Sequence, residues 1–133
     1  MALHTRSVVR ALLLAAALAP LQSCRDGGPA APCDSNVVMT VSAGLSPTFH
    51  WTPACTIGYL AVERLESDGH SSVWMTFDDH NSIRPGIQYG SRSENPAVPL
   101  QPGADYRIRI GTFMGAGGFD LVATIVGTFA FSR

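Results

Sequence analysis

The chain has 133 residues, of which 46% are hydrophobic and 14% are charged, and its formal net charge is −1. This composition excludes a long, highly charged disordered chain, and the length suits a single domain. All nine basic residues are Arg and none is Lys, and the small net charge argues against a strongly basic nucleic-acid-binding protein. We therefore expect no nucleic-acid partner.

The N-terminus has the layout of a secretory signal. Arg6 and Arg10 precede an uncharged apolar run over residues 11–19. This run is shorter than the ~20 residues that a membrane-spanning helix needs, but it suits the apolar part of a signal peptide. The small residues of Ala17-Leu18-Ala19 match ordinary signal peptidase, but Pro20 would follow that cut and disfavours it.

A second cleavage motif comes directly afterwards. Leu21-Gln22-Ser23-Cys24 resembles the bacterial lipobox, although Gln22 is atypical at its position. The resemblance implies a lipoprotein signal peptide over 1–23, a diacylglycerol on the Cys24 thiol, and Cys24 as the mature N-terminus. Each buried methylene adds ~0.8 kcal/mol of membrane affinity, so two or three acyl chains would anchor the protein stably. A secreted protein without lipid is the alternative.

The residues from Cys24 onward predict a short flexible tether. Gly, Pro and Ala dominate residues 24–34, and no apolar periodicity appears there. Arg25 stands where some envelope lipoproteins carry an Asp that retains them in the inner membrane. By that resemblance the outer membrane of a bacterial envelope is slightly favoured, and the N-terminal lipid is the expected contact with the membrane.

The remaining residues, 35–133, predict one all-β domain. Short β-rich runs alternate with clusters of Gly, Pro, Ser, Asn and Asp, and the spacing suggests about seven strands in a β-sandwich. The expected strands cover residues 36–42, 48–52, 58–65, 72–77, 87–89, 106–113 and 119–131. In the last strand, one parity, and therefore one expected core-facing side, is shared by Phe119, Leu121, Ile125, Phe129 and Phe131.

A sharper signal comes from residues 100–106. Leu100-Gln101-Pro102-Gly103-Ala104-Asp105-Tyr106 resembles the LxPGxxY segment of fibronectin type III domains, in which the Tyr hydroxyl bonds to the upstream backbone as a tyrosine corner. Residues 46–53 look like the family's B strand, with Trp51 as the buried core aromatic. Residues 58–62 and 106–110 look like its C and F strands. The resemblance implies a fibronectin type III-like β-sandwich and a structural role for Leu100, Gly103 and Tyr106.

Two cysteines remain once Cys24 carries the lipid. If the first two strands form a hairpin about Gly44, Cys33 and Cys55 stand equally far from the turn and face each other beyond its paired ends. Disulfides persist in exported proteins, so we predict a Cys33–Cys55 disulfide. Two free thiols are the alternative.

One polar cluster deserves a test for chemistry, namely Asp78-Asp79-His80-Asn81 with His70 upstream. Carboxylates and an imidazole can bind a divalent metal, but Asp and Asn are also ordinary turn residues. The cluster follows an expected strand and precedes Arg84-Pro85-Gly86. We therefore predict a turn, with no metal site and no cofactor.

Catalytic motifs are absent from the sequence. There is no Gly-x-Ser-x-Gly elbow, and Glu63 and Glu66, three residues apart in a strand, point to opposite faces. The Gly-rich residues 115–118 lack the Lys of a phosphate-binding loop and predict a hairpin turn. We expect a protein that is not an enzyme.

Tyr59 and Trp74 are the best candidates for a binding surface. By alternation each stands opposite the core-facing parity of its strand, and exposed aromatic side chains can bind glycans or proteins. The alternative is that both pack under the irregular 82–98 segment. We predict a lipid-anchored, non-catalytic binding or structural module with a protein or glycan partner. The alternatives are an accessory subunit of an envelope complex and a metal-dependent or hydrolytic envelope enzyme.

Overall fold

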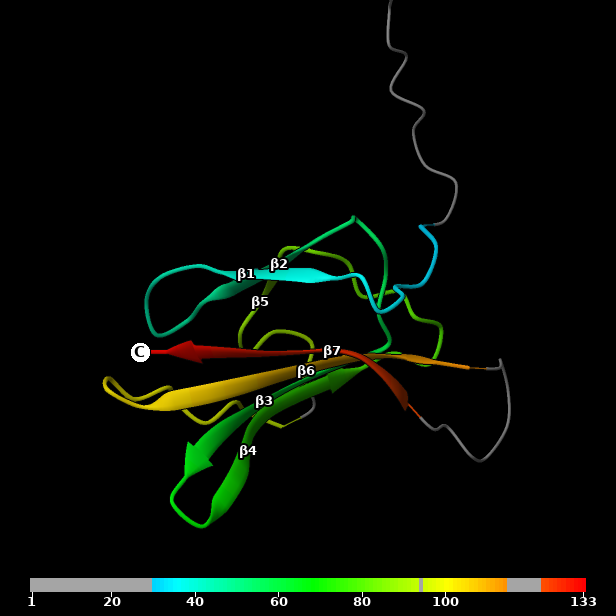
Figure 1. Cartoon of the computed structure of the whole chain (residues 1–133). Coiled ribbons are helices and arrows are strands. Elements are labelled where there is room, and N and C mark those ends of the chain that lie inside the picture. The colour runs from blue at the N-terminus through cyan, green and yellow to red at the C-terminus, as the bar shows by residue number, and fades with distance from the viewer. Residues whose placement is uncertain (1–29, 94, 115–122) are drawn as a thin grey trace, which may run out of the picture.

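The computed structural model describes residues 30–93, 95–114 and 123–133, which contain strands and connecting segments but no helix (Figure 1). Within these ranges, no helix is therefore available that could cross a membrane. The strands are β1 (Val38–Val41), β2 (Thr48–Thr52), β3 (Tyr59–Glu66), β4 (Gly69–Phe77), β5 (Ile87–Gln88), β6 (Asp105–Phe113) and β7 (Ala123–Ser132).

These strands form two antiparallel sheets that pack face to face. The smaller sheet has the order β1-β2-β5 and the larger has the order β4-β3-β6-β7. In Figure 1 the smaller sheet lies above the larger one. The predicted all-β class is therefore confirmed, and the two layers support the predicted sandwich. Cys24, the signal segment and residues 115–118 lie outside the described residues.

The core fills the space between the sheets with one parity of each strand. Leu60 and Val62 of β3 pair with Ile110 and Ile108 of β6, and all four are fully buried because opposite residues share a face. Burying one such side chain contributes ~1.5–3 kcal/mol. Trp51 is 2% exposed, in the core position expected from the sequence, and its Nε1–H donates to the Cys55 carbonyl at 2.9 Å.

Two bulges change which side chains reach the core. In β4, Val62 pairs with Trp74 and Glu63 pairs with Ser72, so Val73 is the extra residue. Trp74 consequently faces inward, where it is 3% exposed and stacks on Phe49 with ring centroids 6.0 Å apart. The expectation that Trp74 lies on a binding surface is therefore wrong.

The second bulge lies in β7. Ile110 pairs with Gly127 and Gly111 pairs with Ile125, so Val126 is the extra residue. Ile125 turns outward and is 42% exposed, whereas Phe129 and Phe131 pack against the core. The expected common parity of the last strand is wrong for Ile125, and Phe119 and Leu121 are not among the described residues.

The predicted disulfide is confirmed, although the hairpin beside it differs from the expected one. Cys33 and Cys55 are bonded with Cα atoms 4.9 Å apart. The β1–β2 ladder pairs Met39 with Trp51, which centres the hairpin on Leu45 and not on Gly44. The cysteines approach through a separate contact described next.

The end of the expected tether is part of the fold. The Cys33 N–H donates to the Thr56 carbonyl at 2.8 Å, and the Thr56 N–H donates to the Ala31 carbonyl at 3.0 Å. Cys33 is only 6% exposed. The predicted start of the domain at residue 35 is therefore too late, because these backbone bonds and the disulfide attach residues 31–33 to Cys55 and Thr56, which precede β3.

Two tyrosines fasten the connecting segments to the sandwich. The Tyr106 hydroxyl accepts a hydrogen bond from the Gln101 N–H at 2.8 Å, within the turn where the sequence places a tyrosine corner. Gly103 in that turn has φ +78°, a left-handed conformation that favours Gly. Tyr89 donates to the Val98 carbonyl at 2.5 Å. Burial, with a smaller contribution from Tyr106, raises the pKa of Tyr89 to about 12.

Candidate functional site

The larger sheet has one side that points away from the smaller sheet, and we call it the outer sheet face. In Figure 1 this side is turned away from β1 and β2. Because cross-strand partners share a face, the register identifies its members. The members used below are Phe77 and Met75 of β4, Tyr59, Ala61 and Glu63 of β3, Gly111, Arg109 and Arg107 of β6, and Ile125 and Thr128 of β7.

One end of the outer sheet face is apolar. Phe77 is 60% exposed, Met75 is 47% exposed and Ile125 is 42% exposed. Tyr59 pairs with Phe77 on one side and with Gly111 on the other, and it is half-buried. We call Phe77, Met75, Tyr59 and Ile125 the apolar band. Exposed apolar side chains that gather in one area of a surface mark interaction sites.

Charged side chains lie next to the apolar band. The Glu63 carboxylate, whose side chain is 4% exposed, accepts hydrogen bonds from Arg107 Nε at 2.8 Å and from Arg109 Nη2 at 2.5 Å. His70 Nε2 is 3.8 Å from the same carboxylate. Burial alone would raise the pKa of Glu63, but the bonds and charges of both arginines outweigh burial and hold the pKa below its usual value.

The two arginines differ in how many of their N–H donors are bonded to Glu63. Arg107 reaches Glu63 through Nε and also through Nη2, at 2.6 Å. Arg109 reaches it through Nη2, and its buried Nε has no hydrogen-bond partner among the described residues. A guanidinium has five N–H donors, and the Arg109 side chain is 36% exposed. Two guanidinium groups therefore share one carboxylate, and spare donors remain on Arg109 beside the apolar band.

The structure separates the two aromatics proposed as surface residues. Tyr59 lies on the outer sheet face, as the alternation suggested, whereas Trp74 is in the core. Trp74 packs against Tyr89 with ring centroids 5.3 Å apart, and the Tyr89 hydroxyl bonds Val98. The alternative of packing under the 82–98 segment therefore applies to Trp74.

Sequence reasoning missed most of this face. Phe77 and Met75 were not singled out, because the bulge that turns them outward has no clear sequence signal. From the sequence, Glu63 was considered only as a possible catalytic partner of Glu66. The alternation of Arg107 and Arg109 on the outward parity of their strand was visible in the sequence, but the carboxylate they share lies 44 and 46 residues away.

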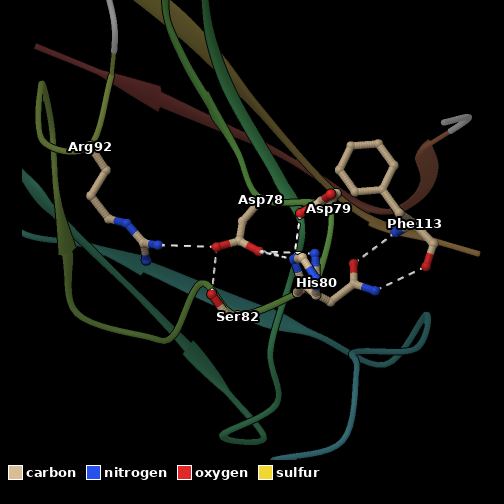
Figure 2. A network of polar contacts seen from close by, with 7 residues as sticks. Asp78, Asp79, His80, Ser82, Arg92 and Phe113 are labelled. Atoms are coloured by element: carbon tan, nitrogen blue, oxygen red, sulfur yellow. Dashed lines mark hydrogen bonds and ion pairs between the residues drawn. The ribbon is translucent and has the colours of Figure 1, made fainter. Parts of the chain in front are cut away.

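The Asp78–Asn81 segment forms a turn immediately after β4, and Figure 2 shows its contacts. Asp78 Oδ1 accepts the His80 backbone N–H at 2.9 Å, while Oδ2 accepts the Ser82 hydroxyl at 2.5 Å and Arg92 Nη2 at 3.2 Å. The Ser82 hydroxyl bond, opposed by burial and assisted by the His80 N–H and the Arg92 charge, lowers the pKa of Asp78.

Asn81 attaches this turn to the larger sheet. Its side chain donates to the Phe113 carbonyl at 2.9 Å and accepts the Phe113 N–H at 2.8 Å; both bonds are the dashed lines at Phe113 in Figure 2. Gly58 is required at this junction, because an added Cβ would lie 2.8 Å from the Asp78 carbonyl and would also collide with Asn81 and Phe113. The turn is therefore held from both sides.

The chemistry open to this turn follows from those contacts. Ligand atoms of Asp78, Asp79 and His80 lie within 4.8 Å of one another, which is compact enough to surround a cation. Both Asp78 oxygens, however, already accept internal hydrogen bonds, and a cation would compete with Arg92. Ser82 donates to Asp78 and not to an imidazole, so it lacks the base that activates a serine nucleophile. The contacts are those of a capped turn.

Comparisons with protein-family models, with curated proteins and with solved structures found no match for the chain.

Proposed function

We propose that this protein is a lipid-anchored module of a bacterial cell envelope that binds a partner without catalysing a reaction. The observation that carries the binding role is the outer sheet face, where a solvent-exposed apolar band adjoins Arg109, whose side chain is 36% exposed. Interfaces combine apolar and aromatic side chains with Arg in this way. In Figure 1 the outer sheet face belongs to the larger sheet, whereas residues 30–35 enter the sandwich beside the smaller sheet.

Two observations support the fibronectin type III-like assignment within this proposal. The segments that resemble the C and F strands are β3 and β6, which pair with each other, and the segment that resembles the B strand is β2 in the opposite sheet. Immunoglobulin-like sandwiches separate these strands in the same way. The Tyr106 hydroxyl also bonds the backbone at Gln101, as a tyrosine corner requires.

The disulfide supports export to the envelope. The Cys33–Cys55 bond is of a kind that persists in oxidising compartments and is rare in reducing ones. Only five residues lie between Cys24 and Ala30, which makes six residue-to-residue steps. At up to ~3.5 Å per residue they span at most about 20 Å, so an acylated Cys24 would keep the sandwich close to the bilayer.

The anchor is tested by replacing the acylated residue. Cys24→Ala should move the protein from the detergent phase to the aqueous phase or leave the precursor uncleaved, and the intact mass should lose the acyl chains. Matched controls are Cys33→Ala and Cys55→Ala, which break the disulfide but leave the lipobox intact and should remain in the detergent phase. Unchanged partitioning and mass for Cys24→Ala would defeat the lipoprotein proposal.

A further inference from the structure

We propose that the outer sheet face docks a partner protein that presents a carboxylate to Arg109, with apolar side chains of the partner resting on the apolar band. This inference rests on the proposed binding function of the same face and names the class of its partner. Three features of the face lead to it, namely its residue types, its charge and the position of that charge.

The residue types favour a protein over a glycan. Phe, Tyr, Met and Arg are enriched at the centres of protein interfaces, whereas Lys is depleted there. The face contains Phe77, Tyr59, Met75 and two arginines. Met75 and Ile125 are aliphatic side chains that offer no ring face for stacking on a sugar. Partner side chains that are themselves apolar would cover them better.

The charge favours an acidic group on that partner. Arg107 and Arg109 share the single carboxylate of Glu63, which leaves a positive charge next to the apolar band. His70, 48% exposed and 3.8 Å from Glu63, adds to this charge when protonated. Asp105 is on the same parity of β6, but it is four residues from Arg109, roughly 13 Å along the strand, and it accepts a bond from Ser132.

The position of Arg109 argues against a second copy of this chain as the occupant. Arg109 pairs with Ala61, which pairs with Met75, so Arg109 lies one row from Tyr59 and Phe77. In a two-fold symmetric contact the same surface meets itself. A two-fold arrangement that lays the Arg109 rows of two copies on each other would bring two Arg109 side chains together. An acidic partner surface gives the guanidinium a carboxylate that its spare donors can bind.

Site-directed photo-crosslinking of the full-length protein in the cells that produce it tests this inference. A photo-reactive p-benzoylphenylalanine replaces Thr128, which is exposed and pairs with Arg109. A matched probe replaces Leu45, which is 49% exposed between the strands of the smaller sheet. We expect a protease-sensitive adduct of one discrete mass from position 128 and none from position 45.

Substitutions then test the chemistry of the contact. Arg109→Gln should lower the yield of the adduct at least 10-fold, and Arg109→Lys should restore part of it because the charge returns. Phe77→Ser should also lower the yield, and its 60% exposure means that the change leaves the fold intact. Arg84→Gln, which removes an exposed Arg from the segment before β5, should leave the yield unchanged.

Each other outcome overturns the inference in a recognisable way. A protease-resistant smear would identify a glycan, and an adduct of twice the chain mass would identify a second copy; in both cases the face still binds, so the proposed function would survive. An adduct indifferent to Arg109→Gln and Phe77→Ser would exclude the contact described here. Equal labelling, or none, from positions 128 and 45 would defeat both the inference and the proposed binding function.

Discussion

Glu63 and Asp78 are both shielded carboxylates whose pKa is held below its usual value, yet they belong to regions of different character. Asp78 accepts bonds from His80, Ser82 and Arg92, all within the loop regions that it holds in place. Glu63 is also fully bonded, and its partners Arg107 and Arg109 are both partly exposed on the outer sheet face. Each region therefore includes a partly exposed arginine, and the two regions differ in the surface around it: polar turn residues surround Arg92, whereas the apolar band adjoins Arg109.

This difference shows why a depressed pKa alone does not identify a functional site. Structural ion pairs perturb pKa values as binding sites do. The more informative feature is the kind of surface that surrounds the partly exposed cation. Around Asp78 the neighbouring side chains are polar turn residues, whereas beside Arg109 the exposed side chains include Met75 and Phe77.

The largest expected effect concerns Glu63. Glu63→Ala should lower the free energy of unfolding by about 2–3 kcal/mol, because it removes a buried carboxylate and leaves two guanidinium groups unpaired; their partial exposure keeps the cost below the 3–5 kcal/mol of a fully buried pair. Urea denaturation measures it. The control Glu66→Ala removes a more exposed carboxylate of the same strand and should be much milder. Equal effects would remove the distinction between them.

Asp78→Ala should cost less, about 1–2 kcal/mol. It deletes the acceptor of three hydrogen bonds, but the side chain is 18% exposed, so water can replace part of what is lost. Asp79→Ala is the matched control, because Asp79 is 56% exposed and its carboxylate pairs with the exposed His80. The same urea measurement decides, and an Asp79 effect as large as the Asp78 effect would contradict the capped-turn description.

Acidification should lower the free energy of unfolding through both Glu63 and Asp78. The folded-state pKa values of Glu63 and Asp78 lie below their unfolded values of about 4.3 and 3.9, so their contribution to stability is present above pH 4–5 and is lost as the pH falls through the lower folded-state values. Melting curves from pH 6 to pH 2 follow this loss. The double variant Glu63→Gln, Asp78→Asn should show a flatter dependence; an unchanged slope would mean that other carboxylates dominate.

The smallest expected effect is that of divalent cations. Because both Asp78 oxygens are occupied, Ca²⁺ or Zn²⁺ at millimolar concentration should leave the Tm unchanged. Replacement of Asp78, Asp79 and His80 by Asn, Asn and Ser provides the reference protein. A cation-dependent rise in Tm that disappears in the triple variant would show that this turn binds metal after all.

Local patterns in the sequence were sufficient for much of the fold. The strand positions follow from alternation, and the contact of Tyr106 with the preceding turn lies within a motif of seven residues. The disulfide was predicted correctly, although the predicted hairpin centre, Gly44, lies one residue before the observed one, Leu45. The strands and the Tyr106 contact depend on residues that are close in the chain. The disulfide had one possible pairing once Cys24 was assigned to the lipid.

The candidate site was harder to predict because it depends on register between distant strands. Bulges at Val73 and Val126 reverse the parity of the residues beyond them, and each turns an expected face around. Trp74 consequently moves into the core, while Ile125 moves to the surface. The arrangement of Arg107 and Arg109 about Glu63 also requires the β3–β6 register, which no local pattern specifies.

The central claim is that the outer sheet face is covered by a partner in the envelope, and oxidation of Met75 tests it most directly. Met75 is 47% exposed in the free chain, and Met114, 79% exposed just beyond β6, reports access of the reagent. Mass spectrometry after brief peroxide treatment should show Met75 oxidised several-fold more slowly in intact envelopes than in the purified protein, relative to Met114. Arg109→Gln should abolish this protection. Equal relative rates in envelopes and in the purified protein would contradict the account.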